Sequence, residues 1–386
     1  MTREAVIVDC ARSAFGKRKG ALADWHPTDL LGLVLRTLVE RNDLDPARID
    51  DVVGGCVTQS GEQGCNVTRN AWIAAGLPWN VPATSVDRQC GSSQQAAHFV
   101  AQGVIAGAYD VAVACGVESM TRAPMSSNAR GGTGPFSPAF LEHTDNTLGI
   151  QFWVAQVLAD KWGITREQMD AYALQSHQRA AANTDNGFFA GEIVPVPVEG
   201  GALAVDEGIR RDASLEKMAA LGPAWVSEDQ PAPDITAANA SQMTDGASAM
   251  LIASADFAEQ HDLPVRARFR HVAVAAEDPV LVLSAPVPVT YKLLERSGMK
   301  LDEMDAVECN EAFAAIALMW QKEFDYPMEQ FNPRGGAIAL GHPLGASGVA
   351  LMTRLLRHLE ATGGRYGFQT MCEGGGQANA TVIERL

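Results

Sequence analysis

Two stretches of the chain share one pattern of apolar and polar positions. Residues 28–57 and 290–310 each read as an amphipathic helix, a Leu-Asp turn and a short buried strand of apolar β-forming residues. Val52 and Val307 occupy matching places, and the same spacing carried forward from Cys90 reaches Gly345. The pattern therefore predicts that the chain contains two related halves.

Cys90 and Gly345 each lead into a predicted helix. Residues 92–106 are apolar on nearly all sides, which predicts a buried helix, whereas residues 349–360 carry one apolar face. Each helix continues through glycine into an apolar strand, at 110–117 and 365–372. Nearly all-apolar strands that alternate with helices favour sheets covered by helices on both faces, so the expected fold class is α/β.

The segment from 119 to 237 has no counterpart in the second half. It contains a Gly/Pro/Ser-rich stretch and a predicted helix over 166–182, preceded by a Thr165-x-x-Gln168 capping box. Insertions of this length are usually functional. We expect an N-terminal half of residues 1–118 plus 238–265, an inserted loop domain of residues 119–237, and a C-terminal half of residues 266–386.

Composition and charge exclude several classes of function. A chain of 386 residues, 47% of them apolar, can form two cores. Its formal charge of −16 repels nucleic acid and anionic lipid, so neither is an expected partner. The sequence contains neither a secretory signal pattern nor an apolar stretch of the ~20 residues that span a membrane, and we expect a cytoplasmic protein. An anionic ligand would need local basic residues such as Arg210, Arg211 and Lys217.

Two of the seven cysteines stand out. The cysteines are odd in number and scattered, without a CxxC pair, so neither a disulfide framework nor a metal site is expected. Cys90 lies in a turn that enters a buried helix, where the helix N-terminus favours a thiolate and supplies an oxyanion donor. Cys372 precedes three glycines after a buried strand, which indicates close approach of a ligand. A second thiol is suited to proton transfer at a carbon beside a thioester.

His342 and Asn310 are further candidates. If the halves pack with pseudo-twofold symmetry, both helix N-termini face one centre, and His342 lies near Cys90 as its base. Asn310 follows a predicted strand, where its amide could hold a water or a thioester oxygen, or could cap a helix over 311–320. No GxGxxG stands between a strand and a helix, which excludes a dinucleotide site.

At these residues the sequence resembles the thiolase family. The motifs QCGSSQQA, NEAFA, GHPLGASG and CEGGGQ are similar to the family's nucleophile, Asn, His and second-Cys motifs, and they occur in family order. Similarity continues in CARSAFGKRKGALAD, ITREQMDAYALQSHQRAA and NASQMTDGASAML. The resemblance implies a duplicated α-β-α-β-α layered fold with an inserted loop domain, assembled as a homotetramer that is a dimer of dimers.

The same resemblance implies an acyltransferase that cleaves 3-ketoacyl-CoA with coenzyme A through an acyl-Cys90 intermediate, reversibly. Coenzyme A is then a co-substrate, and no cofactor is permanently bound. His342 would activate Cys90, and Cys372 would move the proton at the acetyl α-carbon. The N–H groups of Cys90 and Gly374 would form one oxyanion hole, and Asn310, through a water, would form the other with His342.

The resemblance also implies where substrates bind. The loop domain would hold coenzyme A, with Arg210 near the nucleotide and Ser241 near the pantetheine. Leu148 and Phe313 would line the acyl pocket. Leu148 stands where short-chain members carry Met in a His-Met-Gly motif, so we expect a degradative enzyme that accepts bulkier chains.

Two features of the sequence bear on the subgroup. Glu373 stands where the family usually has an apolar residue, and Ala378-Asn379 where Gly is frequent. The texts VDRQCGSSQQA and GGRYGFQTMCEGGG are most similar to thiolases of actinobacterial steroid and acyl-CoA breakdown.

The alternatives are a biosynthetic acetoacetyl-CoA thiolase, a non-catalytic CoA-binding scaffold, and a ketosynthase-like condensing enzyme. The second cysteine argues against a ketosynthase, because those sites carry His or Asn there.

Overall fold

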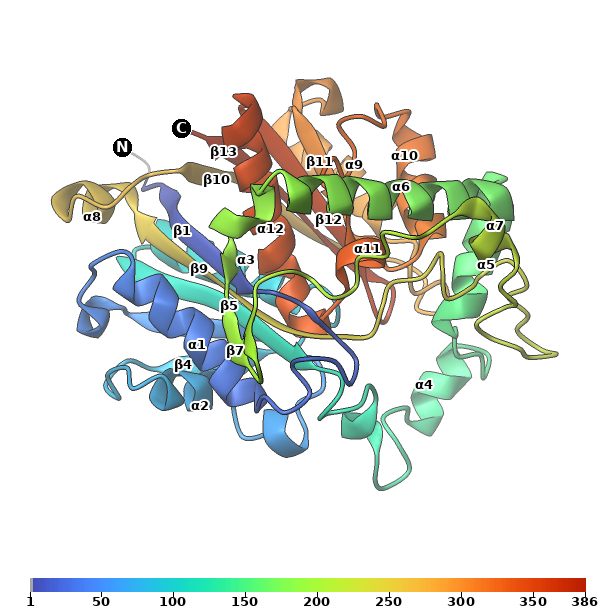
Figure 1. The fold of residues 1–386 in the computed structure, drawn as a ribbon, viewed down its shortest axis with the longest axis horizontal. Helices are drawn as coiled ribbons and strands as arrows, with labels where there is room; N and C mark the ends of the chain where they lie inside the picture. The colour runs from blue at the N-terminus through green and yellow to red at the C-terminus, as the bar shows by residue number, and fades with distance from the viewer. Residues whose placement is uncertain (1–2) are drawn as a thin grey trace.

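Strands from both halves of the chain form the central layers of the protein (Figure 1). The computed structural model describes residues 3–386. The main sheet has the order β11-β12-β13-β10-β1-β9-β5-β3-β4, with β2 beside β9 and β6 beside β1. The strands are β1 (Ala5–Ser13), β2 (Gly16–Lys17), β3 (Asp51–Gly55), β4 (Ala83–Val86), β5 (Val111–Ser119), β6 (Ile193–Val194), β7 (Val196–Val198), β8 (Gly201–Leu203), β9 (Thr244–Ser254), β10 (Ala267–Ala276), β11 (Ala306–Cys309), β12 (Tyr366–Glu373) and β13 (Gln377–Arg385).

Helices cover the outer faces of the sheet, and two further helices lie between the strands of the N-terminal half and those of the C-terminal half. The α-helices are α1 (Pro27–Glu40), α2 (Val67–Ala74), α3 (Ser92–Ile105), α4 (Pro138–His143), α5 (Gln151–Trp162), α6 (Arg166–Asp185), α7 (Leu215–Ala219), α8 (Ala255–Gln260), α9 (Pro286–Ser297), α10 (Ala314–Phe324), α11 (Ala337–Leu340) and α12 (Leu344–Thr362). One apolar core joins α1 and α2 to the N-terminal strands, and another joins α5, α9 and α10 to the C-terminal strands. A third core contains α3, α12 and strands of both halves. The layering confirms the predicted α/β class.

The predicted repeat corresponds to equivalent strand pairs. Val52 of β3 lies opposite Val113 of the parallel strand β5, and Val307 of β11 lies opposite Phe368 of the parallel strand β12. In each half the helix that leads into the second strand, α3 or α12, lies in the middle layer. The two halves are joined where β1 pairs antiparallel with β10.

The helix expected to open at Gly345 begins one residue earlier, whereas the alternative that Asn310 caps a helix is wrong. Helix α12 begins at Leu344, with Pro343 at its N-cap. Asn310 does not cap the next helix, because α10 begins at Ala314 with Phe313 at the N-cap position. The glycines after His342 that suggested a loop therefore belong to the first turns of α12.

Those glycines allow α12 to cross α3 at close range. A Cβ atom on Gly348 would lie 2.2 Å from the backbone nitrogen of Gln94 in α3. A Cβ on Gly345 would lie 2.6 Å from the carbonyl oxygen of Val117 and 2.7 Å from that of Gly55. Backbone atoms cannot move aside cheaply, so the lack of side chains at these positions sets how closely the two halves approach.

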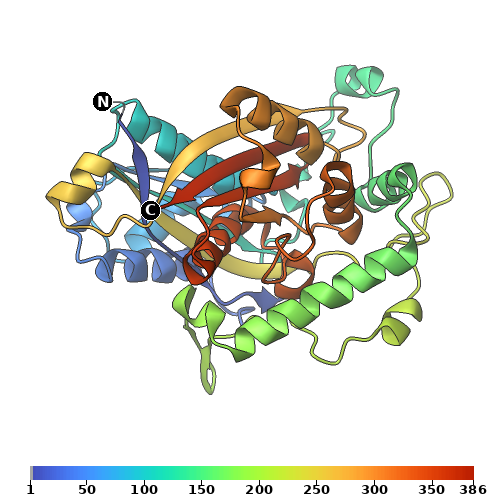
Figure 2. The ribbon, with the colours of Figure 1, turned by 90° about the horizontal axis from the view of Figure 1, so that it is seen from above.

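The segment between β5 and β9 carries α4 to α7, and Figure 2 shows α6 running along the outside of the C-terminal half. The capping box predicted at Thr165 and Gln168 is confirmed, and α6 extends to Asp185. A buried ion pair network ties this segment to β1. Arg12 donates to Glu192 at 2.6 Å and to both oxygens of Asp206 at 2.7 and 2.9 Å.

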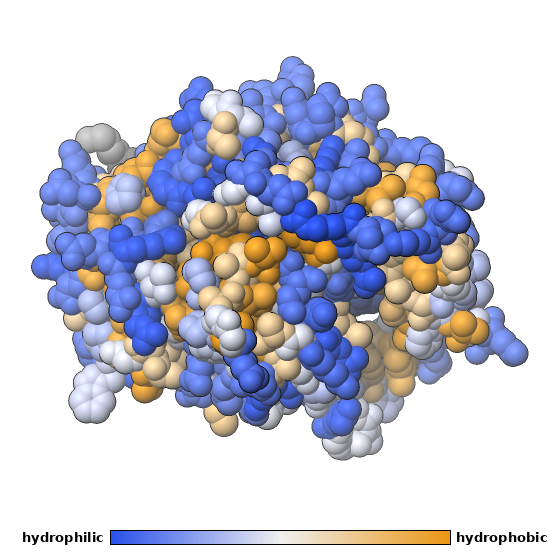
Figure 3. Space-filling view, viewed as in Figure 1, coloured by the Kyte–Doolittle hydropathy of each residue, from blue (hydrophilic) through white to orange (hydrophobic). Residues whose placement is uncertain are grey.

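The face of the molecule drawn in Figure 3 is largely hydrophilic. Figure 3 shows hydrophilic side chains over most of this face, with smaller hydrophobic areas between them. Within residues 3–386, the helices are too short or too polar to cross a membrane.

The close crossing of α3 and α12 makes a testable prediction. Gly348→Ala should lower the melting temperature by about 2–6 °C, because overpacking against backbone costs about 1–3 kcal/mol and outweighs the gain in helix propensity. The matched control is Gly222→Ala, since a Cβ at Gly222 meets no atom within 4 Å. Equal melting temperatures for both variants, measured by differential scanning calorimetry, would contradict this account of the interface.

Candidate active site

Cys90 lies in a tight turn between β4 and α3. The preceding residue, Gln89, has a φ of +48°, in the left-handed region, and its N–H donates to the Asp87 carboxylate at 2.7 Å. The Ser92 hydroxyl accepts from the Arg88 N–H at 2.9 Å and donates to the Gln89 carbonyl at 2.6 Å. These bonds fix the turn and hold Cys90 at the entrance of the helix.

The surroundings of Cys90 bring distant parts of the chain together. Its side chain, 7% exposed, packs in a small apolar cluster with Val57, Met120, Leu344 and Met371. Leu344 is two residues beyond His342, and Met371 directly precedes Cys372. The packing of Cys90 thus brings together the segments that contain His342 and Cys372, and Cys372 lies near enough for its charge to act on Cys90, although 282 positions separate the two cysteines in the chain.

Neither thiol is ionised in advance. Burial raises the pKa of Cys90 well above its usual value, and the nearby charges of Cys372 and Glu373 raise it further. Burial likewise raises the pKa of Cys372, with smaller contributions from Cys309 and Glu373. The prediction that the helix N-terminus lowers the Cys90 pKa is wrong, because desolvation outweighs it here. Cys90 therefore needs a base to form its thiolate.

His342 has the geometry of a neutral base. Ser347 Oγ donates to the Pro343 carbonyl at 2.9 Å, so its lone pair accepts from His342 Nδ1 at 2.6 Å. This bond fixes the hydrogen on Nδ1 and leaves Nε2 as the unprotonated nitrogen, which accepts from Asn310 Nδ2 at 3.3 Å. Burial lowers the pKa of His342 to about 4, so the imidazole is neutral at pH 7.

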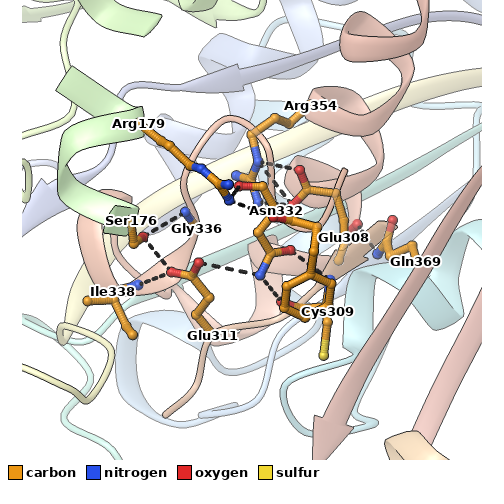
Figure 4. Close-up of polar contacts among 12 residues, drawn as sticks. Ser176, Arg179, Glu308, Cys309, Glu311, Asn332, Gly336, Ile338, Arg354 and Gln369 are labelled. Carbon is orange, nitrogen blue, oxygen red and sulfur yellow. Dashed lines mark hydrogen bonds and ion pairs between the residues drawn. The ribbon is translucent and has the colours of Figure 1, made fainter. Parts of the chain in front are cut away.

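Asn310 is held at the end of β11 by buried polar contacts. Its N–H donates to the Thr370 carbonyl at 3.0 Å, while its side-chain oxygen is buried without a partner among the described residues. The next residue, Glu311, accepts from Ser176 Oγ at 2.7 Å and from the Ile338 N–H at 3.1 Å (Figure 4). A buried amide oxygen without a protein partner suits an ordered water.

The sequence did not single out Glu118, the penultimate residue of β5. Its buried carboxylate accepts from the N–H groups of Val57 at 2.9 Å, Thr58 at 3.0 Å and Gly345 at 2.9 Å. Burial raises the pKa of Glu118 despite these bonds. It ties the start of α12 to the loop after β3, beneath Cys90. The sequence signal that could have drawn attention to Glu118 is an acidic residue near the end of an otherwise apolar strand.

The predicted coenzyme A contacts lie on the segment after β5 and beside α10. Arg210 is exposed, and its N–H donates to His177 Nδ1 at 3.1 Å. Its basic neighbours Arg211 and Lys217 are paired with acidic side chains at 2.8 and 2.7 Å. The Ser241 N–H donates to the Ala312 carbonyl at 2.9 Å, which puts Ser241 next to the NEAFA motif.

The two residues predicted for the acyl pocket differ in their surroundings. Phe313 is buried in the same apolar core as Cys372, and its ring meets Phe152 edge-on at 5.4 Å. Phe152 in turn stacks on Trp225 at 6.2 Å. Leu148 is half-buried in the loop before α5, and its carbonyl accepts from Gln230 at 2.9 Å. Leu148 does not belong to the apolar cluster around Cys90, so its place in the acyl pocket remains a prediction.

The site contains thiols, an imidazole and an amide. Across residues 3–386, no three His, Cys, Asp or Glu side chains are grouped so that they could hold a metal ion. This combination of groups can perform nucleophilic acyl transfer with proton transfer at a second position.

Comparison with known proteins agrees with this architecture. The family model of the thiolase N-terminal domain matches residues 5–256, and that of the thiolase C-terminal domain matches residues 263–385. A steroid 3-ketoacyl-CoA thiolase of Mycobacterium tuberculosis is 48% identical over 390 residues, which cover 99% of this chain and 94% of the relative. A 3-ketoacyl-CoA thiolase of Aliivibrio fischeri is 41% identical over 393 residues, 99% of this chain and 100% of the relative.

A solved structure shows the same fold. The crystal structure of the Bacillus anthracis acetyl-CoA acetyltransferase superposes with a TM-score of 0.90 at 32% sequence identity, covering 100% of this chain and 99% of that chain. Since both family domains match nearly the whole sequence, the chain belongs to the thiolase family of acyltransferases.

Proposed function

We propose that this protein cleaves 3-ketoacyl-CoA with coenzyme A, giving acetyl-CoA and a shortened acyl-CoA through an acyl-Cys90 intermediate. One observation carries the proposal: Cys90 packs against residues that adjoin His342 and Cys372, in a chain of the thiolase family. The names of the 48% and 41% identical relatives support a 3-ketoacyl-CoA substrate.

The first half-reaction begins at Cys90. His342 Nε2 takes the thiol proton, and the thiolate attacks the keto carbon of the substrate. The N–H groups of Cys90 and Gly374 hold the resulting oxyanion, a role supported by the position of Gly374 against Gln89, whose Oε1 would be 2.8 Å from an added Cβ. The C2–C3 bond then breaks, which leaves the acyl group on Cys90 and the electron pair on C2.

Proton transfer completes the cycle. The Cys372 thiol protonates C2 and releases acetyl-CoA, while a water on Asn310 and the protonated His342 hold the thioester oxygen. The Cys372 thiolate next takes the proton of coenzyme A, whose sulfur attacks the acyl group. Cys90 leaves as a thiolate and recovers its proton from His342. The reverse sequence is a Claisen condensation.

Substrate binding is assigned to the inserted segment. We divide the chain into halves at 1–118 plus 238–265 and 266–386, around a loop domain at 119–237 that binds coenzyme A. Arg210 contacts the nucleotide, which its exposure and lack of an ion pair in the described chain support. Ser241 contacts the pantetheine, while Phe313 and Leu148 line the acyl pocket.

The assembly proposed is a homotetramer built as a dimer of dimers. Strand β4 ends the sheet order, so one of its edges is open to a second copy. Exposed apolar side chains lie near it, including Trp79, which is 84% exposed.

We assign the enzyme to the cytoplasm, because its thiol chemistry requires a reducing compartment.

The nucleophile assignment is tested by Cys90→Ala. This variant should lose thiolysis by about three orders of magnitude or more, because no other group can carry the acyl chain, while its affinity for coenzyme A should stay within about threefold. Turnover is measured as CoA-dependent loss of 3-ketoacyl-CoA, and affinity by calorimetry. Retained turnover would refute the assignment and the proposed function with it.

The role of Cys372 is tested by Cys372→Ser. A hydroxyl is a much weaker acid than a thiol, so proton transfer at C2 should stall. Incubation with an acyl-CoA should still label Cys90, as detected by mass spectrometry, while thiolysis should fall by about 100-fold or more. The Cys65→Ser variant is the matched control, because that thiol is exposed. Thiolysis at the normal rate in Cys372→Ser would exclude the role.

The acyl group is tested with a substrate panel. If Leu148 marks a roomier pocket, medium-chain and cyclic 3-ketoacyl-CoAs should exceed acetoacetyl-CoA in kcat/KM by about tenfold. Burial of a few additional methylene groups of the substrate supplies the binding free energy for a difference of this size. Leu148→Met restores the residue of the short-chain motif and should reduce this preference for bulkier chains. A preference for acetoacetyl-CoA would instead favour a short-chain acetyltransferase.

A further inference from the structure

A carboxyl group lies beside the two thiols and has no part in the mechanism above. Glu373 ends β12 directly after Cys372 and is fully buried. Its side chain points to the same face of the strand as that of Met371, which contacts Cys90. A Cβ added to Gly91 would lie 1.8 Å from Glu373 Oε1, so the carboxyl group occupies the space beside the first residue after Cys90.

A buried amide connects this carboxyl group to α3. With the Asn379 amide oriented so that both its atoms are paired, its nitrogen donates to Glu373 Oε1 at 3.0 Å and its oxygen accepts from the Gln95 N–H at 3.2 Å. Asn379 belongs to β13, which pairs with β12 across the hairpin. Glu373 and Asn379 thus fasten the hairpin that carries Cys372 to the helix that begins after Cys90.

The second carboxyl oxygen of Glu373 makes no hydrogen bond in the part of the chain that the structure describes. Oε2 is buried and has no hydrogen-bond partner among residues 3–386. Arg88, whose charge acts on Glu373, donates its Nη1 to Gln377 Oε1 at 2.9 Å and forms no salt bridge with Glu373. An ionised carboxylate with a bare oxygen in the interior is costly, whereas the protonated acid is neutral.

The charges around Glu373 favour the same state. The titratable or charged groups that face it are Arg88 and Cys90, on the turn before α3, and Cys372 on its own strand, with Glu118 of β5 acting on Cys90 beyond them. Burial raises the pKa of Glu373 to about 9, against the opposing effects of Arg88 and of the Asn379 backbone N–H. A negative charge here would oppose ionisation of both thiols.

We propose that Glu373 is a positioning residue that works as a neutral carboxylic acid. It holds the hairpin β12–β13 against the first turn of α3 and keeps a third negative charge away from the thiols. The proposal rests on the function proposed above, in which Cys90 and Cys372 each form a thiolate during the cycle. Glu373 contributes to the reaction in two ways: it fixes the distance between the two thiols, and it leaves the space beside them uncharged.

Two substitutions separate the geometric and the electrostatic parts. Glu373→Ala removes the contact with Asn379 and should lower kcat for thiolysis at pH 7.5 by about tenfold, and Glu373→Gln should restore it to within about threefold of the unsubstituted protein. From pH 7.5 to pH 10, the ratio of kcat in Glu373→Gln to that in the unsubstituted protein should rise at least about threefold, because only the glutamate acquires charge. Exposed Glu295→Gln is the matched control and should keep its ratio constant. A constant ratio in Glu373→Gln, or no rescue by Gln, would overturn the proposal.

A measurement without substrate separates this proposal from the proposed function. The rate of Cys90 alkylation by iodoacetamide, followed by mass spectrometry, should show the same rise in the Glu373→Gln ratio between pH 7.5 and pH 10. Parallel alkylation profiles in a protein that performs Cys90-dependent thiolysis would overturn only the role of Glu373. Absence of thiolysis together with a rising alkylation ratio would overturn only the proposed function.

Thermal stability gives a second readout. The folded protein keeps the proton of Glu373 up to about pH 9, whereas the unfolded chain releases it near the ordinary value of 4.5. The stability that this proton contributes is therefore complete below pH 4.5 and is lost as pH rises toward 9. Gln does not titrate, so the melting temperature of Glu373→Gln minus that of the unsubstituted protein should increase from pH 5 to pH 8.5. A difference that does not change with pH would count against a neutral Glu373.

Discussion

The close crossing of α3 and α12 in the middle layer is the constraint on which the site depends. Gly348 lies against the backbone of α3, and Gly345 lies against the backbone at the ends of β3 and β5, so the first turns of α12 pack directly on backbone of the other half. Both helices begin at the same end of the layer, which brings the turn containing Cys90 and the loop containing His342 together.

The site is built almost entirely from neutral groups. Burial raises the pKa of both thiols and lowers that of His342, so each group is uncharged before substrate arrives. The buried carboxylate of Glu118 meets several N–H donors and acts as a structural tie. Charge is therefore created during the reaction, at positions where fixed donors are available, rather than stored in the resting protein.

Much of the fold could be predicted because the signals were local. The repeated apolar pattern identified the paired strands and α3, and the capping box at Thr165 identified the start of α6. The position matching Cys90 in the repeat located the start of α12 to within one residue, although glycines disfavour helices, because tertiary packing overrides that propensity here. The raised pKa of Cys90 and the contact between Glu373 and Asn379 depend on three-dimensional burial, which spacing along the chain does not encode. The motif residues Cys90, His342 and Cys372 could be named from sequence, whereas the only signal for Glu118 was its acidic character near the end of an apolar strand, which does not by itself indicate a role.

The buried guanidinium of Arg12 has a consequence for the stability of the first strand. Arg12 lies on the first strand, but its partners Glu192 and Asp206 follow 180 and 194 residues later, and β9 and β10, which flank β1 in the sheet, later still. A buried guanidinium without its partners costs several kcal/mol, so β1 is stable in the sheet only together with the segment that carries Glu192 and Asp206. The segment between β5 and β9 thereby contributes to the stability of the strand layer as well as to its surface.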